Sequence, residues 1–336
     1  MIKNKCFIIA EAGVNHNGSF KNAIKLVDIA VSAKADFVKF QFFRADSLAK
    51  QNAPKANYQI INTEKEQSQF KMLKSLELTP SDFKKIINYC KKFKIKFLAS
   101  IFDTTFLDII IENKIDFIKI PSGEITNAPL LRKVGKLKKT VFLSTGMSNL
   151  REISEAVNIL IDSGIKKSKI YIMQCNTEYP TPDKDVNLNV LSLLKKEFNL
   201  KVGLSDHSLG NEAGIAAIAM GAKVIEKHVT INKKMKGPDH SSSMNSNEFI
   251  NFVKAIRRTE QMLGKKIKVV TKSEKKNIKI ARRSIYTKND IKKGKVILES
   301  DLIMLRPNLG LSPMKMEKVI GRKSKRNYKK YDLISL

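Results

Sequence analysis

The sequence has no tryptophan, only three cysteines in 336 residues, and no long apolar run. Three thiols are too few for a disulfide framework in so long a chain, and their spacing matches no zinc motif, so we expect a reducing, cytoplasmic setting. The first apolar run, Cys6–Ala10, ends at Glu11, and a secretory leader needs roughly 7–15 apolar residues. The most apolar internal stretch, Gly214–Ala222, is shorter than the ~18 residues of a membrane span. Neither export nor membrane insertion is expected.

Acidic residues are also scarce. Lysine and arginine number 63 against 32 aspartates and glutamates, which gives a net charge of +31. About half of this excess lies after Gln261, where 22 basic residues face 6 acidic ones. Such a tail could bind nucleic acid. Most of the basic residues are lysines and no aromatic residues alternate with them as base-stacking platforms, so a solvated basic surface is favoured over a nucleic-acid partner.

Apolar residues make up 42% of the chain, enough for a sizeable core, and their pattern predicts alternating strands and helices. Nearly continuous apolar runs are typical of parallel strands buried on both faces. Eight strand–helix alternations favour a (β/α)8 barrel over an open sheet. The predicted strands are Cys6–Ala10, Phe37–Gln41, Lys96–Ser100, Asp116–Ile120, Thr140–Ser144, Ile170–Gln174, Lys201–Leu204 and Ala222–Glu226.

Amphipathic segments between these strands predict helices, two of them capped by Ser19 and Ser81. The connection from Phe42 to Pro80 contains no predicted strand, and loops this long are often functional. After Leu263 the pattern changes to a charged linker and then to short β-like runs. We therefore predict a barrel domain at 1–264, a linker at 265–280 and a small β-rich domain at 281–336.

Polar side chains follow nearly every predicted strand, at the end of a barrel where active sites lie. Lys39 and Lys119 lie inside apolar strands, and a buried lysine without an anion is costly. With nearby serines they form a ring of donors suited to a phosphate and a carboxylate. His207 and His228 end neighbouring strands and could share one divalent ion, although two structural histidines would fit the same pattern.

Several motifs, taken together and in order, resemble the bacterial sialic acid synthase family. They are Ile8–Gly18 (IIAEAGVNHNG), Val38–Gln41 (VKFQ), Lys119–Glu124 (KIPSGE), Leu143–Met147 (LSTGM), Cys175–Pro182 (CNTEYPTP), Gly203–Ser208 (GLSDHS), Ile225–His228 (IEKH) and Gly237–His240 (GPDH). The tail from Ala281 to Gly310 resembles the small antifreeze-like (SAF) domain that these enzymes carry. The resemblance implies a synthase that condenses phosphoenolpyruvate with an N-acyl hexosamine and releases phosphate.

The resemblance also implies roles for individual residues. The metal ligands would be His207 and His228, and the metal manganese. Arg306 would reach from the small domain into the barrel of a partner, which implies a domain-swapped homodimer. Glu11 is the favoured catalytic base, with Glu124 second. The remaining implied contacts are, for phosphoenolpyruvate, Lys39, Ser100, Lys119, Ser122, Ser144, Thr177 and Ser205, and, for the sugar, Gln41, Tyr179 and Asp239.

Two departures from the family pattern and two alternative functions stay open. The third strand ends Ala99–Phe102 (ASIF) in place of Ser-Thr-Pro-Phe, and Gln174 replaces a histidine. A Schiff-base aldolase would use Lys39 or Lys119 without metal and without releasing phosphate. Within the synthase family, N-acetylmannosamine would give N-acetylneuraminate, the product we expect first. The alternative acceptor, 2,4-diacetamido-2,4,6-trideoxymannose, would give N,N'-diacetyllegionaminate.

Overall fold

The computed structural model describes residues 5–336, so the first four residues of the predicted barrel domain lie outside the described part. The chain divides into two compact units, one ending at Gly264 and the other comprising Lys265–Leu336. Among residues 5–336, no helix has the length and apolar character needed to cross a membrane. The three cysteines are buried and unpaired.

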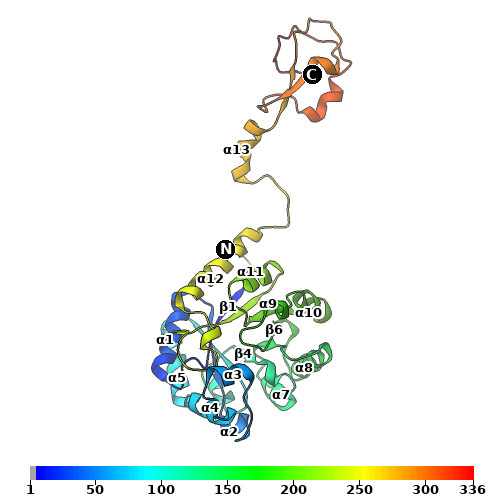
Figure 1. Cartoon of the computed structure of the whole chain (residues 1–336). Helices are drawn as coiled ribbons and strands as arrows, with labels where there is room; N and C mark the ends of the chain where they lie inside the picture. The colour runs from blue at the N-terminus through cyan, green and yellow to red at the C-terminus, as the bar shows by residue number, and fades with distance from the viewer. Residues whose placement is uncertain (1–4) are drawn as a thin grey trace. The chain divides into compact units, whose positions relative to one another are not determined.

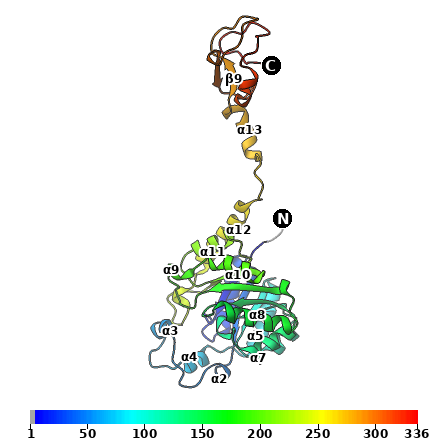
Figure 2. The same ribbon diagram turned by 90° about the vertical axis from the view of Figure 1, so that its right-hand side faces the viewer.

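The first unit is a closed barrel of eight parallel strands in sequential order, which confirms the predicted (β/α)8 fold. Each strand pairs with the next, and β1 also pairs with β8 to close the sheet. Helices surround the strands (Figures 1 and 2). The strands are β1 (Phe7–Gly13), β2 (Phe37–Phe42), β3 (Lys96–Ile101), β4 (Phe117–Ile120), β5 (Thr140–Ser144), β6 (Ile170–Cys175), β7 (Lys201–Asp206) and β8 (Val224–His228).

Five of the helices that follow the strands begin with a side-chain N-cap. The hydroxyl of Ser19 accepts a hydrogen bond from the Asn22 amide, as predicted. The expected cap at Ser81 is wrong, because Thr79 caps this helix and Pro80 occupies its first turn. The helices that follow the strands are α1 (Phe20–Ser32), α5 (Pro80–Lys92), α6 (Leu107–Glu112), α7 (Ala128–Lys136), α8 (Leu150–Asp162), α9 (Asp183–Val186), α10 (Val190–Phe198), α11 (Glu212–Ala219) and α12 (Ser246–Leu263).

The long connection between β2 and α5 folds into three short helices. They are α2 (Ala45–Leu48), α3 (Asn57–Asn62) and α4 (Gln69–Leu76). Met72 and Leu76 of α4 are buried with Val14 and Phe43 in a small apolar cluster of their own. The connection is therefore an ordered element packed on the barrel.

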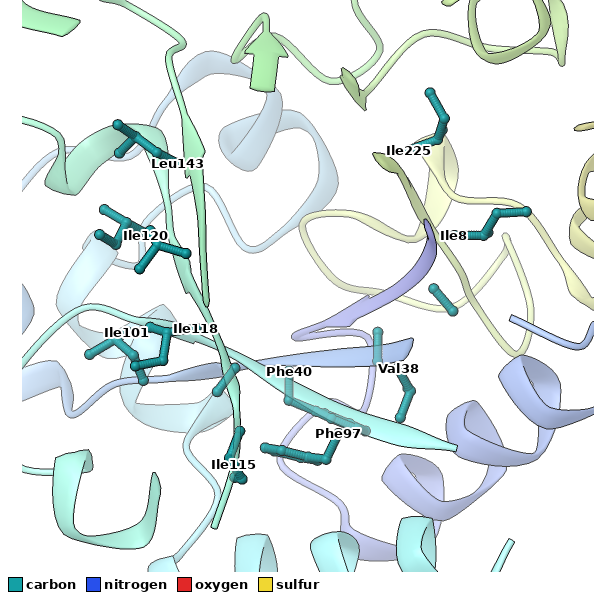
Figure 3. Close-up of a cluster of buried hydrophobic side chains, with 14 of the residues drawn as sticks. Ile8, Val38, Phe40, Phe97, Ile101, Ile115, Ile118, Ile120, Leu143 and Ile225 are labelled. Atoms are coloured by element: carbon teal, nitrogen blue, oxygen red, sulfur yellow. The ribbon is translucent and has the colours of Figure 1, made fainter. Parts of the chain in front are cut away.

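Alternation along the strands divides the barrel core into two layers. Side chains such as Ile8, Val38, Ile118 and Ile225 point outward and pack with the helices (Figure 3). The intervening positions point inward and form a separate cluster of Ile9, Phe37, Leu98, Phe142, Tyr171, Met173 and Val224. This inner cluster fills the amino-terminal end of the barrel, so open space remains only toward the carboxyl ends of the strands.

The second unit has a small core of its own. Its two strands, β9 (Ser284–Thr287) and β10 (Leu302–Leu305), pair antiparallel. Buried apolar residues from along the unit pack together, namely Ile285, Ile291, Ile297, Leu302, Val319, Tyr328 and Ile334. Much of the predicted linker is helical, because α13 spans Lys272–Ala281, and this helix buries none of its residues.

Gly203 in β7 provides a test of how tightly the barrel wall is packed. A Cβ atom at this position would lie 2.2 Å from Val224 Cγ1 and 2.5 Å from the Val224 carbonyl oxygen of the neighbouring strand. Because backbone atoms cannot move aside cheaply, Gly203→Ala should lower the free energy of unfolding by about 1–3 kcal/mol, measured by urea denaturation. Gly123→Ala is the matched control, since nothing lies within 4 Å of its Cβ position. Equal stability of both variants would contradict this packing.

Candidate active site

A cavity of about 330 Å³ opens at the carboxyl ends of the barrel strands. Side chains of every strand reach it, because the last inward-facing position of each parallel strand lies at the same end of the barrel. All of the residues proposed from the sequence of the first unit line this cavity except Asp239. They are Glu11, Lys39, Gln41, Ser100, Lys119, Ser122, Glu124, Ser144, Thr177, Tyr179, Ser205, His207 and His228.

Two lysines and two glutamates form a buried charge network at the base of the cavity. Lys119 Nζ lies 2.8 Å from both carboxylate oxygens of Glu226. Lys39 Nζ lies 2.8 Å from Glu11 Oε2 and 3.5 Å from Glu226 Oε1. None of the four side chains is more than 4% exposed. Glu226 therefore supplies the anion that the two buried ammonium groups require.

The two carboxylates differ in their acid–base properties. Burial raises the pKa of Glu11 to about 7, although Lys39 partly offsets this effect. Burial also acts to raise the pKa of Glu226, but the charges of Lys119 and Lys39 outweigh it and hold that pKa well below its usual range. Glu226 is thus a permanent anion, whereas Glu11 can take up or release a proton near neutral pH.

Serine hydroxyls complete a ring of hydrogen-bonding groups around the charges. Ser100 Oγ accepts from Lys39 Nζ at 2.7 Å, and Ser205 Oγ donates to Glu226 at 2.8 Å. Ser122 Oγ accepts from the Gly146 amide at 3.0 Å. The buried Ser144 hydroxyl has no partner within residues 5–336. Cations and hydroxyls in this arrangement are suited to bind an anion that carries several oxygens.

Two imidazoles lie side by side at the rim of this network. The ring centroids of His207 and His228 are 5.3 Å apart. His207 Nδ1 lies 2.5 Å from the Asn176 carbonyl oxygen, which fixes the ring and turns Nε2 toward Tyr179 and the cavity. His228 Nδ1 is buried, and no described residue forms a hydrogen bond with it. Burial lowers the pKa of His228 well below its usual value, so this imidazole is neutral.

These two rings fit one divalent metal ion that takes its other ligands from water or substrate. Within residues 5–336 there is no group of three histidine, cysteine or acidic side chains arranged for a complete site. Space beside the rings is kept open by Gly13, where a Cβ would lie 3.2 Å from Glu11 Oε1 and 3.5 Å from His228 Cε1. Burial acts to lower the pKa of His207, but Cys175 and the Asn176 carbonyl outweigh it and raise that pKa, so a metal ion would bind this ring in competition with a proton. An open coordination position beside histidine ligands is typical of catalytic metal sites.

Asp239 does not line the cavity. Asp239 Oδ2 lies just behind it, 3.8 Å from His228 Nδ1, and burial raises the pKa of this carboxyl to about 6. Arg306 belongs to the second unit, where its side chain is exposed. Its expected contact with the barrel of a partner stays a prediction.

The segment between β2 and α5 lines the cavity as well, which the sequence analysis anticipated only as a long connection. Leu48, Gln69 and Leu73 belong to α2 and α4 and line the cavity with Tyr58 and Gln59 of α3. The Tyr58 ring lies 4.9 Å from that of Tyr179, centroid to centroid. Helix α3 is held in place by Asn62, whose amide donates to the Pro238 carbonyl at 3.0 Å.

Glu226 is the main residue that sequence reasoning missed. It lies two positions before His228 and so on the same inward face of β8, directly after the apolar residues Val224 and Ile225. A charged residue beside apolar strand residues can be recognised in the sequence, and Lys39 and Lys119 were selected as candidate site residues on that ground. The backbone carbonyl of Asn176 could not have been found in this way, since any residue supplies a carbonyl.

Comparisons with known proteins place this geometry in a family. Residues 26–268 match the model of the NeuB family, and residues 282–335 match the SAF domain. The chain is 46% identical to the N,N'-diacetyllegionaminic acid synthase of Campylobacter jejuni, covering 98% of this chain and 99% of that protein. It is 40% identical to the enzyme of the same name from Legionella pneumophila, with 96% and 91% covered.

More distant relatives are named for other products. The human N-acetylneuraminate-9-phosphate synthase is 29% identical over 96% of this chain and 89% of its own length. Among solved structures, the N-acetylneuraminic acid synthetase of Leptospira borgpetersenii, in complex with citrate, aligns with a TM-score of 0.71 at 31% identity. That alignment covers 82% of this chain and 90% of the other.

Removing the Glu226 charge should destabilise the empty barrel. Glu226→Gln leaves two buried ammonium groups without their shared anion, and breaking a buried ion pair on one side costs about 3–5 kcal/mol. We expect a lower thermal unfolding midpoint, and a larger rise in that midpoint on adding inorganic phosphate than the wild type shows. Glu155→Gln, at the exposed pair with Arg151, should leave the midpoint nearly unchanged. A Glu226→Gln variant as stable as the wild type would refute the counter-ion role.

Proposed function

The chain belongs to the NeuB family and is a phosphoenolpyruvate-dependent nonulosonic acid synthase, and from that premise we propose that its product is N,N'-diacetyllegionaminate. Two synthases of that name are 40% or more identical to it over nearly the whole chain. The N-acetylneuraminate product that the sequence analysis expected first has weaker support, since the human synthase of the corresponding phosphate is 29% identical. This difference in similarity is the observation that carries the proposal.

The walls of the cavity support the choice of acceptor. Compared with N-acetylmannosamine, 2,4-diacetamido-2,4,6-trideoxymannose has a methyl group at C6 and a second acetamido group at C4. Leu48, Leu73 and Phe102 offer apolar contact to methyl groups, and Gln59 and Gln69 offer amides to an acetamido group. An apolar wall discriminates only modestly against an added hydroxyl, whereas unmatched hydrogen-bonding groups discriminate more strongly.

Phosphoenolpyruvate would bind at the base of the same cavity. Its phosphate and carboxylate match the ammonium groups of Lys39 and Lys119 and the hydroxyls of Ser100, Ser122, Ser144 and Ser205, with Thr177 beside them. Glu226 contacts both lysines. Because each lysine has three donor hydrogens, the substrate oxygens can share the lysines with Glu226.

Synthases of this family are generally metal-dependent, and His207 and His228 would hold the ion, for which we propose manganese. When bound, a divalent ion supplies Lewis-acid polarisation of an oxygen atom. The Asn176 carbonyl orients His207, and Tyr179 packs against the same imidazole with ring centroids 4.1 Å apart. Gln41 and Tyr179 line the cavity and would contact the sugar, whereas Asp239 lies behind it, 3.8 Å from His228 Nδ1.

The reaction joins C3 of phosphoenolpyruvate to the aldehyde carbon of the open-chain sugar, and the aldehyde oxygen becomes a hydroxyl. Water adds at C2, and phosphate leaves as the C2–O bond breaks, so the ketone oxygen comes from water. Glu11 is placed to accept the proton of that water, because its pKa lies near neutrality and Lys39 holds its carboxylate at 2.8 Å. Glu124, whose pKa is raised by burial, is the second candidate.

The proposed function is tested by product analysis. The purified chain with manganese is incubated with phosphoenolpyruvate and each sugar, and the products are identified by mass spectrometry. We expect kcat/KM for the diacetamido sugar to be at least ~100-fold higher than for N-acetylmannosamine, with one phosphate released per product. Lys119→Met should lose most activity with either sugar. A preference for N-acetylmannosamine would contradict this proposal and support N-acetylneuraminate as the product. Borohydride trapping of a lysine adduct without phosphate release would indicate an aldolase.

The proposed assembly is a homodimer in which Arg306 of one chain serves the cavity of the other. A planar guanidinium can direct hydrogen bonds to sugar hydroxyl or acyl oxygens in a geometry that lysine cannot reproduce. Mixing Arg306→Ala chains with Lys119→Ala chains should restore part of the activity, because one cavity of each mixed dimer would be intact. Native mass spectrometry must first show that subunits exchange. Mixed dimers without activity would contradict the shared site.

A further inference from the structure

We propose that Asp206 and Lys227, a buried ion pair on the outer face of the barrel wall, set the spacing of the two imidazoles on the inner face. Neither residue lines the cavity, whereas the residues on either side of them, Ser205, His207, Glu226 and His228, all do. Asp206 and Lys227 would be positioning residues, since they act only through their histidine neighbours. The inference rests on the proposed role of His207 and His228 as metal ligands.

Asp206 and Lys227 lie at the end of the stretch over which β7 and β8 are paired. Asp206 and Lys227 are direct partners in the register of these strands, and no later pair follows. Lys227 Nζ lies 2.8 Å from Asp206 Oδ2, and both side chains are at most 2% exposed. His207 follows Asp206 directly after the end of β7, and His228 follows Lys227 as the last residue of β8. The spacing of the two rings therefore follows from how this residue pair is held.

The same pair also fixes the turn that follows His207. Asp206 Oδ1 accepts hydrogen bonds from the Ser208 amide at 2.9 Å and from the Ser208 hydroxyl at 2.6 Å. Lys227 Nζ donates to the Ser208 carbonyl at 2.5 Å. Residues on both sides of His207 are therefore tied to the residue that precedes His228. A disturbance of the pair would move one imidazole relative to the other.

A stability role alone explains the pair poorly. The desolvation of two buried charges largely cancels their attraction, so well-packed neutral side chains are often as stabilising. Metal binding, in contrast, depends on ligand distances held within about 0.2 Å. Outer groups that orient metal ligands commonly change metal affinity 10- to 100-fold when they are replaced. Fixing the geometry of the histidine pair therefore accounts better for an ion pair in this position.

The test uses the double variant Asp206→Asn/Lys227→Met in the full-length chain. Either single substitution would leave a buried charge unpaired and could prevent folding, but the double variant removes both charges and keeps the net charge unchanged. The carboxamide oxygen that replaces the Asp206 carboxylate can still accept from Ser208, so the local turn is retained. A change in metal affinity therefore reports geometry and not electrostatic attraction. Arg257→Met is the matched control, because it breaks an ion pair with Asp36 near the start of β1.

The dissociation constant of Mn²⁺ is measured by electron paramagnetic resonance without substrate, and thermal unfolding is measured on the metal-free proteins. We expect the double variant to bind Mn²⁺ at least ~10-fold more weakly than the wild type, and Arg257→Met to bind it within twofold whatever its unfolding midpoint. Wild-type affinity in a folded double variant would overturn the positioning role. Absence of Mn²⁺ binding by the wild type would instead overturn the metal role of the histidines themselves.

Discussion

The need to pair two ammonium groups inside a protein barrel governs the active end of this molecule. Lys39 and Lys119 are almost fully buried, and Glu226 contacts both of them from β8. The arrangement keeps two ammonium groups available to an anionic substrate without leaving a buried charge unpaired. It also separates the two carboxylates by function, since Glu226 stays ionised while the pKa of Glu11 is raised to about 7.

The rest of the barrel provides the conditions for this charge network. The aromatic and aliphatic cluster around Phe37 and Phe142 fills the opposite end of the barrel, so the charges meet solvent from one side only. The helices between β2 and α5 line the mouth, where the ring of Tyr58 lies at a tilt against that of Tyr179. Substrate would therefore enter a largely desolvated site in which each polar contact is stronger than it would be in water.

The two faces of strands β7 and β8 serve different purposes. Their inner face carries Ser205, Glu226 and the two histidines of the cavity. Their outer face carries the Asp206–Lys227 pair at the same level, away from the cavity. Because alternate residues of a strand face opposite sides, the ion pair that sets the geometry can stay clear of the reacting groups. Gly203 adds to this precision by letting Val224 pack against the β7 backbone.

The sequence by itself determined the eight strands, the barrel and most of the residues that line its mouth, because strand alternation and the polar residues at strand ends are local properties. It did not determine that Lys119 on β4 meets Glu226 on β8, since these strands are not neighbours and come into contact only across the closed barrel. The position of Tyr58 at the mouth of the cavity was not determined by the sequence pattern either. It depends on the hydrogen bond by which Asn62 of α3 contacts the Pro238 carbonyl. The cap at Thr79 and the helix at Lys272–Ala281 depend on capping boxes, Thr79 with Asp82 and Thr271 with Glu274, that are present in the sequence but that the analysis of apolar patterns did not use.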